Sequence, residues 1–141
     1  MIEGVILTPL KKICGDKGSV FHGIKSSDKG YAGFGEAYFS TVNYGDIKSW
    51  RKHKKMTLNL IVPVGEIKFV LYDSRISGKS RGRTFSVIIG DGNYCRLTIP
   101  PQVWMAFEGV GKGLNLLLDV ANFEHDPEEE ERAEIEEFPY E

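Results

Sequence analysis

The hydrophobic residues of the chain fall into short runs that are separated by turn-forming segments. Segments 15–18, 28–30, 77–80 and 90–93 are rich in Gly, Asp, Asn, Ser and Lys, and they bound runs rich in Val, Ile, Thr, Tyr and Phe. This alternation of runs and turns is typical of β-strands. Many short strands at regular spacing predict an all-β sandwich or barrel. The predicted strands are 4–9, 19–24, 35–42, 56–62, 66–73, 84–89, 94–99, 103–108 and 114–122.

Within some of these runs, apolar residues alternate with polar ones. Leu58, Leu60 and Val62 would share one face of their strand, and residues 96–99 alternate in the same way. We expect the apolar face to form the core. Pro100 and Pro101 cannot donate backbone hydrogen bonds, so the strand before them should end there and a new strand should start just after.

Only the end of the chain has a helical pattern. Asp126 would be the N-cap, Pro127 the first helical residue, and the following acidic residues would lie in the first turn, where the helix dipole favours them. The sequence predicts a short C-terminal helix over about 126–137.

Length and composition place the chain among ordinary globular proteins. Its 141 residues, with 41% hydrophobic and 27% charged residues, fit a single domain spanning 1–141. No apolar run reaches the roughly 18–20 residues of a membrane span, and Met1–Val5 does not resemble a secretion signal. We therefore expect a cytoplasmic protein without a membrane partner, with Cys14 and Cys95 as free thiols.

The net charge of −2 conceals two oppositely charged parts. Residues 124–141 contain ten acidic residues and one arginine, a balance of −9, which leaves seventeen basic and ten acidic residues, a balance of +7, in 1–123. A basic body favours anionic ligands. The acidic end is either a solvated face or a segment that repels nucleic acid.

Several motifs, taken in order, resemble the dTDP-4-dehydrorhamnose 3,5-epimerase family. They are Asp16-Lys17-Gly18, then Asn43, then a histidine in a basic segment, then the run Val64–Arg75, and finally Ile99-Pro100-Pro101. The segment Gly45–Leu60 is similar to a short, epimerase-like branch of this family. The resemblance covers about residues 5–127. It implies a cupin-type double-stranded β-helix, or jelly roll, that acts on a nucleotide-linked 4-keto-6-deoxy sugar of bacterial surface polysaccharide biosynthesis, without a cofactor and as a homodimer.

The chemistry that this resemblance implies needs a base, a group that stabilises an enolate, and an acid. The residue that matches the family's base is His53, which lies among Lys48, Arg51, Lys52, Lys54 and Lys55. That cluster could hold a nucleotide diphosphate by charge. The alternative is a solvent-exposed basic loop with a lone histidine.

Further candidates for substrate binding come from the resemblance and from residue chemistry. Lys17 matches a phosphate-binding arginine of the family, and Asn43 belongs to the shared motif order. Arg75 either contacts phosphate or pairs with Asp73. Trp50 and Trp104 either stack on a sugar or base, or belong to the core. Together with three residues of the basic cluster, they form the candidate binding set, which consists of Lys17, Asn43, Lys48, Trp50, Arg51, Lys55, Arg75 and Trp104.

The chain departs from the family at three places. Met105 occupies a position where the family has a histidine, Leu58 matches the family's enolate-stabilising lysine, and no tyrosine lies near Pro127. His125 or Glu124 could supply the missing acid, or His125 and Asp126 could simply cap the helix. The phenols available in the predicted barrel are those of Tyr38, Tyr44, Tyr72 and Tyr94.

These departures leave two hypotheses, an epimerase or isomerase and a catalytically inactive cupin that binds a sugar nucleotide or partners a biosynthetic enzyme. A metal-binding cupin needs an H-x-H pair, but His53 has Arg51 and Lys55 two positions to either side. We therefore expect neither a metal nor another cofactor. A nucleic-acid partner is not expected either, because Trp50 is the only aromatic residue within the basic run.

Overall fold

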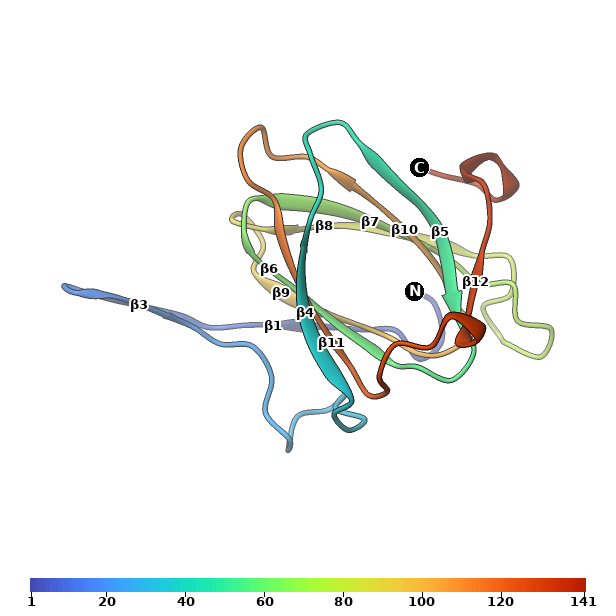
Figure 1. Cartoon of the computed structure of the whole chain (residues 1–141), viewed down its shortest axis with the longest axis horizontal. Coiled ribbons are helices and arrows are strands. Elements are labelled where there is room, and N and C mark those ends of the chain that lie inside the picture. The colour runs from blue at the N-terminus through green and yellow to red at the C-terminus, as the bar shows by residue number, and fades with distance from the viewer.

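The computed structural model describes all 141 residues and consists almost entirely of antiparallel strands. Two five-stranded sheets face each other, with strand orders β1-β9-β6-β11-β4 and β12-β5-β10-β7-β8 (Figure 1). The first sheet contains β1 (Ile6–Pro9), β4 (Glu36–Thr41), β6 (Leu58–Val64), β9 (Cys95–Ile99) and β11 (Leu116–Ala121). The second contains β5 (Ile47–His53), β7 (Glu66–Tyr72), β8 (Thr84–Gly90), β10 (Trp104–Gly109) and β12 (Glu130–Arg132). This is the predicted jelly-roll architecture.

The main core lies between the two sheets. Leu58, Leu60 and Val62 of β6 pack there with the inward residues of β7, among them Phe69 and Leu71, and all are less than 5% exposed. The shared face predicted for β6 is thus confirmed. Each of the nine predicted strands is present, with ends shifted by at most three residues.

Two strands within residues 1–123 were not predicted from the sequence. One is β5, whose sequence is dominated by basic residues, and the other is β2 (Lys12–Gly15). β2 pairs with β3 (Gly18–Phe21) in a hairpin that projects from the body of the molecule, at the left of Figure 1. Every residue of the two hairpin strands is exposed.

The turn between β6 and β7 requires glycine. Gly65 has a φ of +82°, and a Cβ atom there would collide with the Leu114 carbonyl oxygen and with Asn115. The Asn115 side chain instead accepts a hydrogen bond from the Glu66 backbone N–H at 3.0 Å. The Gly65-Glu66 pair of the sequence motif is therefore a structural turn that lets the chain pass directly from one sheet to the other.

The C-terminal segment is not the predicted helix. Asp126 does act as an N-cap and accepts a hydrogen bond from the Glu128 N–H, but it caps a single 3₁₀ turn, η1 (Pro127–Glu129). The chain then forms β12 on the edge of β5 and a second 3₁₀ turn, η2 (Ile135–Glu137). Pairing with a strand edge and packing of the following aromatic residues outweigh the local preference for helix.

That packing forms a second, smaller apolar cluster on the outer face of the second sheet. Trp50 and Trp104 form its centre, and Phe138 and Tyr140 of the C-terminal segment cover them. The Phe138 ring lies 5.7 Å from the ring of Trp50 and 4.9 Å from that of Trp104. No helix in the structure has the length and apolar character needed to cross a membrane.

Candidate active site

A small cavity between the two sheets brings together residues from both of them. Its lining includes residues of β4, at the edge of the first sheet, and of β5 in the second sheet. β4 and β11 contribute one polar group of side chains, and β5 with β12 contributes another. The residues that line the cavity are Tyr38, Ser40, Lys48, Arg51, His53, Leu58, Met105, Phe107, Leu117, Asp119 and Glu130.

His53, at the end of β5, is held by an acid from the C-terminal segment. Its Nδ1 atom lies 2.6 Å from Oε1 of Glu129. The second carboxylate oxygen of Glu129 accepts hydrogen bonds from the backbone N–H groups of Lys55 and Met56, at 2.9 and 2.8 Å. Although burial raises the pKa of Glu129, the His53 contact and these two backbone bonds together lower it below its ordinary value. An ionised Glu129 orients the imidazole and keeps Nδ1 protonated, so that Nε2 is free to accept a proton.

Strand pairing explains why Glu129 lies beside His53. β12 runs antiparallel to β5, with Glu130 opposite His53 and Glu131 opposite Lys52. The Lys54 N–H donates to the Glu129 carbonyl at 2.9 Å, and Lys52 forms an ion pair with Glu131 at 3.2 Å. The acidic end of the chain thus lies on the most basic strand of the body, which accounts for the charge asymmetry of the sequence.

A second polar pair faces the cavity from the opposite sheet. The Tyr38 hydroxyl on β4 donates to Oδ2 of Asp119 on β11 at 2.9 Å. Burial raises the pKa of Asp119 to about 6, against the lowering effect of the Tyr38 hydrogen bond. The other carboxylate oxygen, Oδ1, is buried and has no partner. Burial, the negative charge of Asp119 and the hydrogen bond to it all raise the pKa of Tyr38.

A β-bulge in β5 places two cations in the cavity. Met105 and Phe107 of β10 are two residues apart, yet they pair with Arg51 and Lys48, which are three apart. The extra residue lets Lys48, Arg51 and His53 face the same side, which strict alternation would forbid. The Lys48 ammonium lies over the Phe107 ring, 5.6 Å from its centre, and neither Lys48 nor Arg51 forms an ion pair.

The bulge also turns Ser49 and Trp50 together toward the C-terminal segment. The Ser49 hydroxyl donates to the Ala133 carbonyl at 2.7 Å, and the Trp50 indole N–H donates to the Ile135 carbonyl at 3.0 Å. Trp50 is fully buried in the outer cluster and offers no surface to a ligand. The placement of Trp50 in the binding set is therefore corrected: it belongs to the core, which was the alternative for this residue.

Trp104 is likewise a packing residue on the outer face of the second sheet. It is 7% exposed, its indole N–H donates to the Ser74 hydroxyl at 3.1 Å, and its ring contacts Phe138. The alternation of β10 explains this, because Met105 and Phe107 face the cavity and Trp104 must then face outward. Trp104 is thus also corrected from a ligand contact to a core residue.

The remaining predicted binding residues do not line the cavity. Arg75 binds both carboxylate oxygens of Asp73 at 2.9 Å and the Glu3 carbonyl at 2.6 Å, so it takes the ion-pair alternative. Lys55 lines a separate pocket together with Glu124 and Asp126. Asn43 is exposed after β4, and Lys17 lies at the tip of the projecting hairpin.

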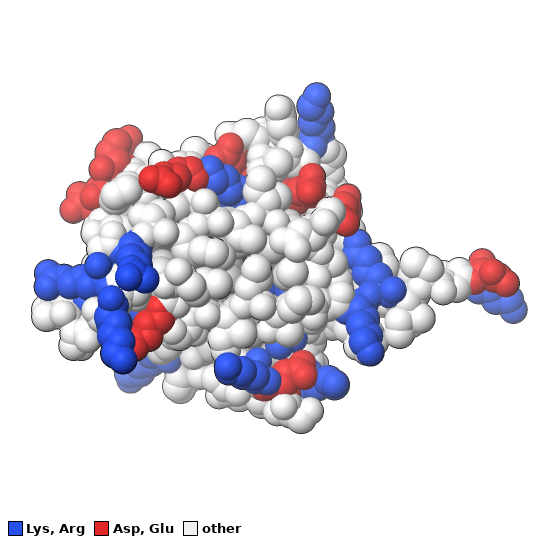
Figure 2. All heavy atoms as spheres, turned by 180° about the vertical axis from the view of Figure 1, so that it is seen from behind, with Lys and Arg blue, Asp and Glu red and all other residues white.

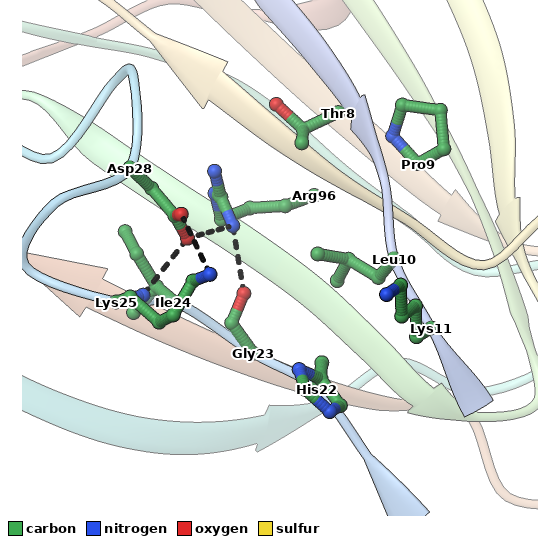
Figure 3. A pocket seen from close by; sticks show the side chains of 10 residues that line it. All are labelled: Thr8, Pro9, Leu10, Lys11, His22, Gly23, Ile24, Lys25, Asp28 and Arg96. Atoms are coloured by element: carbon green, nitrogen blue, oxygen red, sulfur yellow. Dashed lines mark hydrogen bonds and ion pairs between the residues drawn. The ribbon is translucent and has the colours of Figure 1, made fainter. Parts of the chain in front are cut away.

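A separate polar pocket on the outer side of the first sheet contains none of the predicted site residues. Figure 3 shows Arg96 at its centre, with Asp28 and Gly23 beside it. The guanidinium donates to the Gly23 carbonyl at 2.7 Å and pairs with Asp28 at 3.3 Å. Arg96 is fully buried, so these contacts fasten segment 22–28 to β9 and serve the fold.

Glu129 and Asp119 are the site residues that sequence analysis missed, and each had a signal. Asp119 is the lone polar residue within the run 116–121, and an acid in a buried strand needs a specific partner. Glu129 belongs to the acidic segment 124–141, whose charge of −9 is complementary to the basic run 48–55.

Of the four phenols considered, only Tyr38 lines the cavity. Tyr72 packs on Phe138, Tyr94 donates to the His22 carbonyl, and Tyr44 is exposed. No group of three His, Cys, Asp or Glu side chains is close enough together to hold a metal ion.

Several known proteins are similar to this chain in sequence or in structure. No protein-family model matches the sequence. The curated relatives include the spore coat polysaccharide biosynthesis protein SpsL of Bacillus subtilis strain 168, which is 27% identical over 96% of this chain and 89% of the relative. Among solved structures, the 3'-monoepimerase ChmJ of Streptomyces bikiniensis has a TM-score of 0.84 over 94% of this chain and 70% of its own, and at 14% identity it supports the fold.

A more similar solved structure decides the family. The dTDP sugar isomerase of Desulfovibrio desulfuricans G20 is 36% identical over 99% of this chain and 91% of its own length, with a TM-score of 0.95. The chain therefore belongs to the family of dTDP-sugar isomerases and epimerases that share the cupin fold of the dTDP-4-dehydrorhamnose 3,5-epimerases.

Proposed function

We propose that this protein is a cofactor-independent epimerase or isomerase of a dTDP-linked 4-keto-6-deoxy sugar, and that His53 is its base. The observation that carries the proposal is that His53 contacts Glu129 and lines a cavity that is also lined by two unpaired cations. A histidine held at Nδ1 by an ionised carboxylate is suited to remove a proton through Nε2. The similarity to a dTDP sugar isomerase supports this substrate class.

The first chemical step would use only groups of this chain. His53 takes a proton from a carbon next to the sugar's keto group, and the electron pair of the broken C–H bond moves onto the carbonyl oxygen. Lys48 and Arg51 line the same cavity and supply positive charge for the enolate or for the diphosphate. The step passes no electrons to an outside acceptor, so it requires no electron carrier. It requires no metal either, because the two cations supply the positive charge.

Catalysis is the better supported of the two hypotheses. The positions of the family's second histidine and lysine are taken by Met105 and Leu58, and both line the cavity without a proton to transfer. A pure binding module would nevertheless have no need of a buried acid held against His53. The similarity to SpsL suggests that the product enters a surface polysaccharide of the dTDP-rhamnose type or a related one. We place the reaction in the cytoplasm, where the free thiols of Cys14 and Cys95 would stay reduced.

We also propose that the protein is a homodimer and that the hairpin β2–β3 takes part in the interface. The paired residues Ile13 and Val20 are 52% and 58% exposed. In the view from behind, few charged side chains lie at the centre of the molecule and most gather around its rim, while the hairpin projects away from the body (Figure 2). An isolated two-stranded hairpin is marginally stable in water, so a partner surface would stabilise it. A monomeric mass by light scattering at micromolar concentration would contradict the dimer.

The proposed activity is tested with dTDP-4-keto-6-deoxyglucose in heavy water, followed by NMR. Incorporation of deuterium at C3 or C5, together with a new product, is the expected result. Binding of the sugar nucleotide without exchange would instead favour the inactive cupin. The same sample therefore separates the two hypotheses.

A further inference from the structure

The cavity has a second candidate for proton transfer, on the side opposite His53. Tyr38 belongs to β4 and Asp119 to β11 of the first sheet, whereas His53 belongs to β5 of the second sheet. All three line the same cavity. A sugar ring that enters between β4 and β5 would therefore have the imidazole against one face and the phenol against the other.

The state of the Tyr38–Asp119 pair suggests more than a structural role. Asp119 is only 5% exposed, and its Oδ1 atom is buried without a hydrogen-bond partner. Leaving a buried carboxylate oxygen unpaired is costly, and such groups are uncommon away from functional sites. Tyr38, by contrast, is 45% exposed and lines the cavity, and its hydroxyl donates to the buried acid.

We propose that Tyr38, positioned by Asp119, donates the proton to the sugar carbon on the face opposite His53, so that the reaction inverts that carbon. The inference rests on the proposed function and specifies it as an epimerisation. His53 removes the proton from one face and the C–H electron pair moves onto the carbonyl oxygen. The enolate electron pair then forms a new C–H bond with the Tyr38 proton on the other face. The phenolate of Tyr38, a residue that is 45% exposed, recovers a proton from water, and His53 loses its extra proton to water, so protons and electrons balance.

This arrangement explains how the chain could invert a carbon without the tyrosine that the family has near the end of the barrel. A single base can remove a proton and return it only on the same face, which restores the starting sugar. Inversion needs a donor on the other face. Tyr38 is the only phenol that lines the cavity, and no other tyrosine is available from the first sheet at this point.

The test compares Tyr38→Phe with the parent protein in heavy water, using dTDP-4-keto-6-deoxyglucose and measuring deuterium exchange and epimer formation separately. We expect Tyr38→Phe to keep exchange within about threefold, because His53 still abstracts and returns the proton. Epimer formation should fall about 100-fold or more, the usual contribution of a general acid. Tyr72→Phe, on the outer face of β7, is the matched control and should change neither rate.

Asp119→Asn tests the positioning role and provides a second variant if Tyr38→Phe does not fold. An amide can present its NH₂ group as well as its oxygen to Tyr38, so the hydroxyl is no longer held in a single orientation, and kcat for epimer formation should fall at least tenfold while KM and exchange stay near the parent values. Normal epimer formation in either variant would overturn the inference and leave the proposed function intact. Equal loss of exchange and epimer in a variant with the parent's melting temperature would also overturn it. Absence of exchange in the parent protein would contradict the proposed function itself.

Discussion

The Nδ1 atom of His53 lies 2.6 Å from Oε1 of Glu129, although 76 residues separate the two in the chain. The contact depends on β12, which pairs with β5 and carries the acidic segment along the basic strand. The C-terminal segment is therefore part of the site, and its sequence should affect catalysis as well as stability.

Replacing Glu129 by Gln should lower kcat more than it changes the binding of substrate. The amide can still accept the backbone bonds from Lys55 and Met56, but it provides no negative charge to orient His53 and stabilise its protonated form. We expect kcat for deuterium exchange to fall about 10- to 100-fold, in line with the loss of an orienting partner of a catalytic histidine. Glu131→Gln is the control, because Glu131 is paired with Lys52 at the surface. Equal rates for Glu129→Gln and the control would show that the contact has no catalytic role.

Arg51 and its neighbour Lys52 should contribute very differently to ligand binding. Arg51 lines the cavity. Lys52 instead lies over the ring of Trp104, on the outer face of the second sheet, and pairs with Glu131. We expect Arg51→Ala to weaken the binding of dTDP about tenfold or more, since a hydrogen bond to a charged group contributes roughly 1.5–3 kcal/mol. Lys52→Ala should leave the Kd within about twofold. Calorimetric titration of both variants measures this, and an equal loss in both would mean that the anion is held by overall charge instead of by the cavity.

Phe138 should connect the stability of the C-terminal segment to activity. Its ring packs on Trp50, Tyr72 and Trp104. For a half-buried aromatic residue, we expect Phe138→Ala to reduce the free energy of unfolding by about 1–3 kcal/mol and to lower kcat, because the segment that carries Glu129 is then less well held. Phe39→Ala, at a position 64% exposed, should cost less than about 0.5 kcal/mol. Unchanged melting of Phe138→Ala would argue that the cluster does not hold the segment.

Asp73 should make the fold sensitive to acid. The Arg75 hydrogen bonds outweigh the effect of burial and, with the Ser80 hydroxyl, lower the pKa of Asp73 to about 2. The unfolded chain has an aspartate pKa near 3.9, so the stabilising contribution is complete above about pH 4 and is lost as the pH falls toward 2. The parent protein should lose on the order of 2 kcal/mol more than Asp73→Asn across this window, as followed by urea unfolding. Asp91→Asn, at an exposed turn, should follow the parent curve.

The sequence predicted the architecture where apolar residues alternate and failed where a tertiary contact overrides the local pattern. The strand around Leu58–Val62 could be predicted because every second residue enters the core. β5 could not, since its bulge breaks the alternation at Ser49 and Trp50, and polar side chains (Lys48, Arg51 and His53) face the cavity. The run after Pro127 has a helical composition, but its backbone pairs with β5 instead.

The same distinction holds for the site. His53 and the cations beside it could be nominated from the basic run and the family resemblance, because they are adjacent in sequence. Strand pairings that join distant parts of the chain bring Glu129 to His53 and Asp119 to the cavity, and no local pattern specifies those pairings. For Trp50 and Trp104, both a ligand contact and a place in the core stayed open, because the sequence does not show which face of a strand an aromatic residue occupies.

The most direct test of the central claim is the rate at which deuterium from heavy water enters dTDP-4-keto-6-deoxyglucose with the parent protein and with His53→Asn. His125→Asn is the matched control, since His125 is exposed and lies outside the cavity. If His53 is the base, exchange occurs with the parent and with His125→Asn and falls about 100-fold or more with His53→Asn. Exchange at the parent rate in His53→Asn would contradict the assignment.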